Sequence, residues 1–213
     1  MKPGRVWLFD LDNTLHNATL HIFPHINRAM CAYIARQLGL NTQQATHIRQ
    51  DYWNRYGATL LGMIRHHGTD PNDFLRETHQ FPELQHMLDF EKPTLNALRK
   101  LPGRKLIFSN APRHYADAVL QLTGLGRHFS AVYSVENLRF QPKPMLAAFR
   151  ALLHAEHLDP HRCIMVEDSL PNLITAKKLG MKTVWVSPGS RQSPFVDVKI
   201  KSVTELPSRC GRL

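Results

Sequence analysis

Four apolar residues run straight into an acidic motif in the stretch Val6-Trp7-Leu8-Phe9-Asp10-Leu11-Asp12-Asn13-Thr14. An apolar run without polar alternation is typical of a strand that is buried on both faces, as in a parallel sheet. We therefore expect a buried strand over residues 6–9. This strand would present the carboxylates of Asp10 and Asp12 at its carboxyl end.

Further short apolar runs follow at residues 105–108, 131–135, 163–166 and 183–186. Helical patterns lie between or before them at residues 94–101, 115–123, 145–157 and 170–179. Gly124, Gly126 and Gly180 stand where these helices are expected to end. Strands that alternate with helices predict the α/β class, here a Rossmann-like three-layer core with a mostly parallel sheet.

One long segment, residues 16–91, breaks this alternation because it contains no convincing strand pattern. Its periodicity predicts helices over residues 26–38, 43–56, 60–67 and 74–77. We therefore expect a core domain of residues 1–15 and 92–213, and an inserted α-helical cap domain of residues 16–91. Ligands of open α/β sheets bind at the carboxyl ends of the strands, so an insert attached at that end would cover such a site.

Composition narrows the class of protein. The chain has 213 residues, of which 43% are hydrophobic and 21% charged, as in globular proteins. No apolar stretch reaches the ~18 residues of a membrane span, and residues 1–5 lead into the first strand without the apolar segment of a signal peptide. Cys31, Cys163 and Cys210 are far apart, which argues against disulfides and favours a cytoplasmic location.

The formal net charge of +10 suggests anionic partners. The basic residues are scattered, however, and they do not form the dense patch that a nucleic-acid interface needs. We therefore expect neither a nucleic-acid nor a membrane partner. A small anionic molecule fits the charge better.

Polar residues follow each of the first four expected strands. They are Asp10 and Asp12, then Ser109 and Asn110, then Lys143, then Glu167 and Asp168. Carboxylates are oxygen ligands suited to Mg²⁺, and lysine and serine side chains suit phosphate oxygens. Several carboxylates in one place would repel one another unless a cation or a proton lies among them. A pair such as Asp168-Ser169 can also simply cap the following helix.

Together these strand-end motifs resemble those of the haloacid dehalogenase-like hydrolase superfamily, in the subgroup with a helical cap between the first and second motifs. The matching motifs are Asp10-Leu11-Asp12-Asn13-Thr14, Ser109-Asn110, Lys143 and Glu167-Asp168. The acid at position 12 points to phosphoryl transfer, because most dehalogenating members of the superfamily lack it.

The resemblance implies a role for each of these residues. Asp10 would attack phosphorus and form an aspartyl phosphate, and Asp12 would act as general acid and base. Mg²⁺ would be held by the carboxylates of Asp10 and Asp168 and by the backbone carbonyl of Asp12. The phosphate would be bound by Ser109, Asn110 and Lys143, with Thr14 and Glu167 in support.

Two geometries for Asp12 stay open from the residues alone. In an extended strand, Asp12 would share a face with Asp10. A chain that turns after Asp10 would instead bring the Asp12 carboxylate alongside its neighbour.

Within the superfamily, the chain is similar to the pyrimidine 5′-nucleotidase branch. The similar segments are residues 9–15, Tyr52-Trp53-x-x-Tyr56-Gly57 and Asp168-Ser169-x-x-Asn172. Many relatives have glycine where Asn172 stands, and asparagine also tolerates the left-handed backbone. Cap residues expected to contact the substrate are Tyr52, Tyr56, Thr59 and His66, since aromatic rings can stack on a base.

The sequence therefore predicts a Mg²⁺-dependent phosphomonoesterase that acts on a small molecule, a pyrimidine nucleoside 5′-monophosphate. The alternative is a phosphoglycolate or sugar-phosphate phosphatase, or a phosphomutase, of the same superfamily. A non-catalytic binding module that uses the basic residues from Lys199 onward is a further alternative, which the complete set of acidic motifs disfavours.

Overall fold

The computed structural model describes residues 4–209 and residue 211. Within these residues the strands form one six-stranded sheet in the order β3-β2-β1-β4-β5-β6, and every neighbouring pair is parallel. The strands are β1 (Val6–Phe9), β2 (Arg104–Phe108), β3 (Ala131–Tyr133), β4 (Cys163–Glu167), β5 (Lys182–Val186) and β6 (Val198–Ile200). The expected α/β class is confirmed. Strand β6 was not expected, because its three residues are too short a run to stand out.

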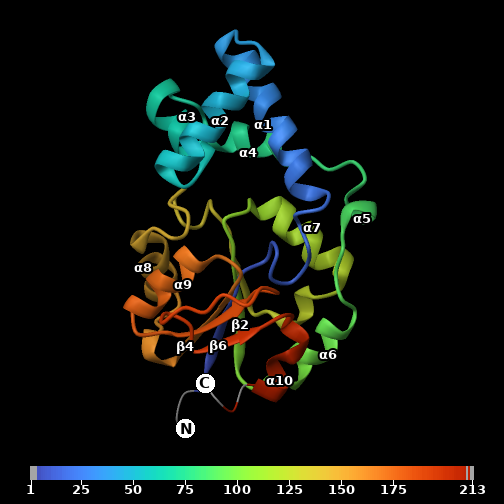
Figure 1. Cartoon of the computed structure of the whole chain (residues 1–213), viewed down its shortest axis with the longest axis vertical. Helices are drawn as coiled ribbons and strands as arrows, with labels where there is room; N and C mark the ends of the chain where they lie inside the picture. The colour runs from blue at the N-terminus through green and yellow to red at the C-terminus, as the bar shows by residue number, and fades with distance from the viewer. Residues whose placement is uncertain (1–3, 210, 212–213) are drawn as a thin grey trace. The chain divides into compact units, whose positions relative to one another are not determined.

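Helices lie on both faces of this sheet (Figure 1). They are α6 (Pro93–Lys100), α7 (Arg113–Thr123), α8 (Leu146–Ala155), α9 (Leu170–Lys178) and the short α10 (Leu206–Arg209). Val6 and Leu8 of β1 belong to a buried cluster with Phe149 of α8 and Leu173 of α9. Successive strand residues point to opposite faces, so Trp7 is buried on the other side, where its indole N–H donates to the carbonyl of Pro102 over 2.9 Å.

The remaining helices form a second compact unit. The contacts divide the chain into Met1–Asn17 with Asp89–Leu213, and Ala18–Leu88. The helices of the second unit are α1 (Ile22–Leu38), α2 (Thr42–Tyr56), α3 (Thr59–His67), α4 (Pro71–Thr78) and α5 (Leu84–Met87).

Local capping explains where two of these helices begin. Asn41 and Gln44 form a reciprocal capping box at the start of α2. Asp70 accepts the backbone N–H of Asn72 at the start of α4, where Pro71 occupies the first position.

Some local expectations were wrong. Gly124 ends α7 with a left-handed φ of 69°, as expected, but Gly126 begins a 3₁₀ helix instead of ending a helix. Asn172 does not occupy a left-handed turn, because it lies inside α9. The asparagine with left-handed geometry is Asn13, whose φ is 61° in the loop after β1.

No described helix combines the length and apolar character that crossing a membrane requires. Cys31 and Cys163 carry free thiols. Cys210 and residues 1–3, which the cysteine and signal-peptide expectations involved, lie outside the described residues.

Candidate active site

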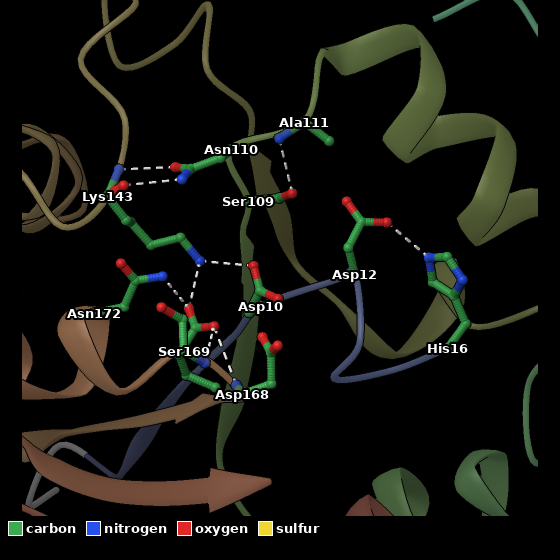
Figure 2. Close-up of polar contacts among 11 residues, drawn as sticks. Asp10, Asp12, His16, Ser109, Asn110, Ala111, Lys143, Asp168, Ser169 and Asn172 are labelled. Atoms are coloured by element: carbon green, nitrogen blue, oxygen red, sulfur yellow. Dashed lines mark hydrogen bonds and ion pairs between the residues drawn. The ribbon is translucent and has the colours of Figure 1, made fainter. Parts of the chain in front are cut away.

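The expected strand-end residues meet at the carboxyl edge of the sheet (Figure 2). Asp10 directly follows β1, and its backbone N–H donates to the carbonyl of Val166 in β4 over 3.0 Å. Ser109 directly follows β2, and its N–H donates to the carbonyl of Tyr133 over 2.9 Å. The parallel ladder therefore continues into the first polar residue after β1 and after β2, and this continuity places the side chains of Asp10 and Ser109.

Lys143, in the loop between β3 and α8, is the buried cation of the site. Its Nζ donates to Asp10 Oδ1 over 2.7 Å and to Glu167 Oε2 over 2.8 Å. The Asn110 side chain holds the Lys143 backbone from both sides, since its Nδ2 donates to the Lys143 carbonyl and its Oδ1 accepts the Lys143 N–H. Contact with the two carboxylates outweighs the effect of burial and raises the pKa of Lys143, so the ammonium stays charged.

Glu167 is surrounded by hydrogen-bond donors. Its Oε1 accepts the backbone N–H groups of Asp168 and Ser169, and its Oε2 accepts from Lys143 and from Asn172 Nδ2. Although burial disfavours its charge, these donors hold the pKa of Glu167 below its ordinary value. Glu167 thus anchors the cation and the start of α9, and Ser169 makes no side-chain cap there.

Asp10, Glu167 and Asp168 bring carboxylate oxygens within 4.8 Å of one another. Burial and the neighbouring Glu167 raise the pKa of Asp10 to about 7, and burial and Asp10 raise the pKa of Asp168 to about 9. The excess of negative charge over the single ammonium of Lys143 is what a divalent cation would relieve. These hard oxygen donors fit Mg²⁺.

The expected phosphate-binding residues are only partly free to bind an anion. The Ser109 hydroxyl is buried and accepts the N–H of Ala111 over 3.0 Å. Its own O–H has no acceptor among the described residues. The Asn110 side chain is committed to Lys143, so Asn110 has only its backbone N–H to offer.

Asp12 lies in the loop after β1, two residues beyond Asp10, with its carboxylate turned toward His16 (Figure 2). Asp12 Oδ1 accepts from Tyr115 over 2.7 Å and lies 3.0 Å from His16 Nε2. The hydroxyl of Thr14 is buried and has no partner among the described residues. Sequence reasoning missed His16 and Tyr115. The available signals were the four-residue spacing of Asp12 and His16, and the position of Tyr115 in the first turn of α7, just after Ser109-Asn110.

Within the helical unit, three of the expected substrate-contacting residues belong to one aromatic–histidine cluster. The Tyr56 hydroxyl lies 2.6 Å from His66 Nε2, and the Tyr52 hydroxyl lies 2.7 Å from His67 Nε2. The Tyr52 and His66 rings stack with centroids 5.3 Å apart. Thr59 stands apart: it is buried, and its hydroxyl donates to the carbonyl of Arg49 over 3.0 Å.

Comparison with known proteins gives a family match and a shared fold. Residues 5–180 match the haloacid dehalogenase-like hydrolase family. A HAD phosphatase structure from Thermococcus onnurineus superposes with a TM-score of 0.68 at 24% identity, covering 97% of this chain and 98% of that one, which shows the shared fold.

Curated relatives include a hexitol phosphatase B and a phosphoglycolate phosphatase. The hexitol phosphatase B of Escherichia coli K12 is 30% identical over 105 residues, 47% of each chain. The phosphoglycolate phosphatase of Pseudomonas fluorescens Pf0-1 is 25% identical over 203 residues, 88% of this chain and 72% of that protein. The chain spans about half the length of the first curated relatives that it matches.

Proposed function

The chain belongs to the haloacid dehalogenase-like hydrolase family, and from this premise we propose that it is a Mg²⁺-dependent phosphomonoesterase acting on a sugar phosphate or phosphoglycolate. One observation carries the proposal. The buried Asp10 carboxylate is held at Oδ1 by Lys143, while no described residue donates to its Oδ2. That arrangement suits a nucleophile, which needs fixed geometry and one unoccupied oxygen.

The other carboxylates are suited to different tasks. Glu167 already accepts four hydrogen bonds, so it is not the nucleophile. Mg²⁺, held by the carboxylates of Asp10 and Asp168 and by the Asp12 carbonyl, would neutralise charge on the phosphoryl oxygens. Ser109, the Asn110 N–H and the third N–H of Lys143 would bind those oxygens.

The reaction has two steps. An oxygen of Asp10 bonds to phosphorus as the bond from phosphorus to the ester oxygen breaks, and Asp12 gives a proton to the departing oxygen. A water then bonds to phosphorus and gives its proton to Asp12 as the bond from phosphorus to Asp10 breaks. Phosphate leaves, and both carboxyl groups return to their starting states.

The relatives guide the choice of substrate. Curated matches named hexitol phosphatase and phosphoglycolate phosphatase support a sugar phosphate or phosphoglycolate more than a pyrimidine nucleotide. The nucleotide prediction rested on segments at residues 9–15, 52–57 and 168–172 that are similar to one branch of the superfamily, and on the aromatic side chains of the helical unit. Two of those aromatic side chains, Tyr52 and Tyr56, are already paired with histidines. The helical insert expected over residues 16–91 would act as the cap domain that selects the substrate; one compact unit, Ala18–Leu88, accounts for most of it.

The test is phosphate release with Mg²⁺ from hexitol phosphates, phosphoglycolate, UMP, CMP, dTMP, AMP and GMP. We expect the hexitol phosphates or phosphoglycolate to have the highest kcat/KM. A higher kcat/KM for UMP, CMP and dTMP would show that the substrate is a pyrimidine nucleotide, and it would leave the catalytic roles proposed for Asp10 and Asp12 unchanged. No release from any ester would overturn the proposal.

A variant pair tests the nucleophile. Asp10→Asn is expected to lower kcat by at least about 10³-fold, because an amide cannot form the acyl phosphate. The matched control is Asp117→Asn, which removes an exposed carboxylate paired with Arg113 and should leave kcat unchanged. A phosphoenzyme that hydroxylamine cleaves should form in the wild type and not in Asp10→Asn. Equal kcat values for Asp10→Asn and wild type would refute the mechanism.

A further inference from the structure

Two side chains outside the family motifs converge on one oxygen of Asp12. The Tyr115 hydroxyl donates to Asp12 Oδ1 over 2.7 Å, and His16 Nε2 lies 3.0 Å from the same atom. The His16 side chain is fully buried and Tyr115 is 1% exposed, whereas the Asp12 side chain keeps 17% of its surface accessible. The carboxyl group is therefore held from its buried side and remains open on the other.

The surroundings of His16 indicate which ring nitrogen carries the proton. His16 Nδ1 is buried and has no hydrogen-bond partner among the described residues. A proton on Nδ1 would be a buried donor without an acceptor, which is unfavourable. The neutral form with the proton on Nε2 avoids this and lets His16 donate to Asp12. Tyr115 and His16 then both act as donors to Oδ1.

Two donors on Oδ1 use both of its lone pairs, while no described residue donates to Oδ2. We propose that His16 and Tyr115 are positioning residues, which fix the Asp12 carboxyl group through Oδ1 so that its Oδ2 alone carries and delivers the proton. This inference rests on the acid–base role of Asp12 in the proposed function. His16 and Tyr115 themselves exchange no proton with the substrate.

If Asp12 delivers its proton from Oδ2, the first step of the reaction depends on how that oxygen is oriented toward the ester oxygen. The proton on Oδ2 passes to the ester oxygen as the bond from phosphorus to that oxygen breaks, and it leaves Asp12 as a carboxylate. An alkoxide leaving group needs this proton, whereas p-nitrophenolate is stable without it. Loss of a donor to Oδ1 frees the carboxyl group to rotate. The kcat/KM for esters of alcohols should therefore fall, whereas kcat/KM for p-nitrophenyl phosphate should not.

The experiment compares kcat/KM for an alkyl phosphate, glycerol phosphate, with kcat/KM for p-nitrophenyl phosphate. This constant reports only the steps up to transfer of the phosphoryl group to Asp10. In Tyr115→Phe and in His16→Gln we expect a loss of about 10- to 100-fold for glycerol phosphate and less than about 3-fold for p-nitrophenyl phosphate. The matched control is Tyr133→Phe, because Tyr133 donates to the carboxylate of Glu156 over 2.7 Å, and both constants should stay unchanged.

A second readout does not depend on turnover. The ¹⁵N NMR signals of His16, assigned by their loss in His16→Gln, should show a proton on Nε2 and none on Nδ1. Asp12→Asn should alter them. A proton on Nδ1, or equal losses of kcat/KM for both esters, would overturn the positioning role while leaving the phosphatase intact. A wild-type protein that hydrolyses neither these two esters nor any ester of the substrate panel would instead overturn the proposed function, and the positioning role with it.

Discussion

Lys143 shows how one residue determines the charge balance of the site. It is 2% exposed, and its ammonium contacts the carboxylates of Asp10 and Glu167. Removing one partner from a buried ion pair leaves a buried charge without compensation, which is far more costly than the pair itself is favourable. The same ammonium fixes Asp10 in place, so stability and the proposed catalytic role of Asp10 both depend on this contact.

We predict that Lys143→Met lowers the free energy of unfolding by about 3–5 kcal/mol at neutral pH, because Asp10 and Glu167 lose their shared counter-charge. Urea denaturation measures this change. The control is Lys105→Met, another buried lysine, whose Nζ donates to the carbonyls of Leu101 and Gly103 and to no carboxylate of the described residues. That variant should lose about 1–3 kcal/mol. Equal losses would show that the carboxylates do not depend on Lys143.

At the scale of elements, the pairing of α2 with α3 depends on a glycine. Gly62 lies within α3, and a Cβ built at this position would approach the Tyr52 ring of α2 to 2.2 Å at Cγ. The absence of a side chain at Gly62 therefore lets Tyr52 pack closely against α3. There its hydroxyl reaches His67 and its ring stacks on His66.

Gly62→Ala separates helix propensity from packing. Alanine favours a helix interior over glycine by about 1 kcal/mol, but overpacking costs about 1–3 kcal/mol and more where the clash lies close to a backbone. The clash includes Tyr52 Cβ, which is bonded to the backbone and cannot move away unless α2 shifts. We therefore expect a net loss of about 1–2 kcal/mol in the free energy of unfolding, measured by thermal or urea denaturation.

Gly126→Ala is the control for this substitution, since the nearest atom to its Cβ lies 3.6 Å away and its φ is not positive. Its stability should stay within about 0.5 kcal/mol of the wild type. A stabilised Gly62→Ala variant would mean that Tyr52 does not pack on α3 in solution.

At the scale of the whole molecule, the acidic cluster links folding to pH and to metal. The pKa of Asp10 rises from 3.8 to about 7, and that of Asp168 from 3.8 to about 9. Between pH 3.8 and about pH 7 at Asp10, and between pH 3.8 and about pH 9 at Asp168, the folded protein without a cation holds protons that the unfolded chain has released. Its free energy of unfolding therefore falls as the pH rises through this range. The lowered pKa of Glu167 stabilises the folded protein above the ordinary pKa of a glutamate. This stabilisation is lost only as the pH falls to more acidic values.

We predict that Mg²⁺ raises Tm more at about pH 8.5 than at about pH 5.5, because protons compete with the ion for Asp10 and Asp168. Thermal unfolding in EDTA and in saturating Mg²⁺ measures the difference, and calorimetry should show protons released on binding. In Asp168→Asn most of the Mg²⁺ effect should vanish. A Tm increase that is the same at both pH values would contradict this linkage.

Local sequence by itself determined the framework of this protein. Apolar runs such as Val6–Phe9 and residues 163–166 form the central strands because residues buried on both faces of a sheet are apolar. Glycine and capping residues, such as Gly124 and Asn41, set where helices end and begin. Parallel strands share one carboxyl edge, so the sequence alone predicted that Asp10, Ser109 and Asp168 would meet there.

Only the tertiary structure decided how these side chains are paired. Tyr115 reaches Asp12 across 103 residues of sequence, and Lys143 reaches Asp10 across 133. Hydrogen bonds of this kind depend on distances of about 3 Å, which strand and helix patterns do not define. The contacts of Lys143 with Asp10 and Glu167, and of Tyr115 with Asp12, therefore emerged only when packing brought distant segments together.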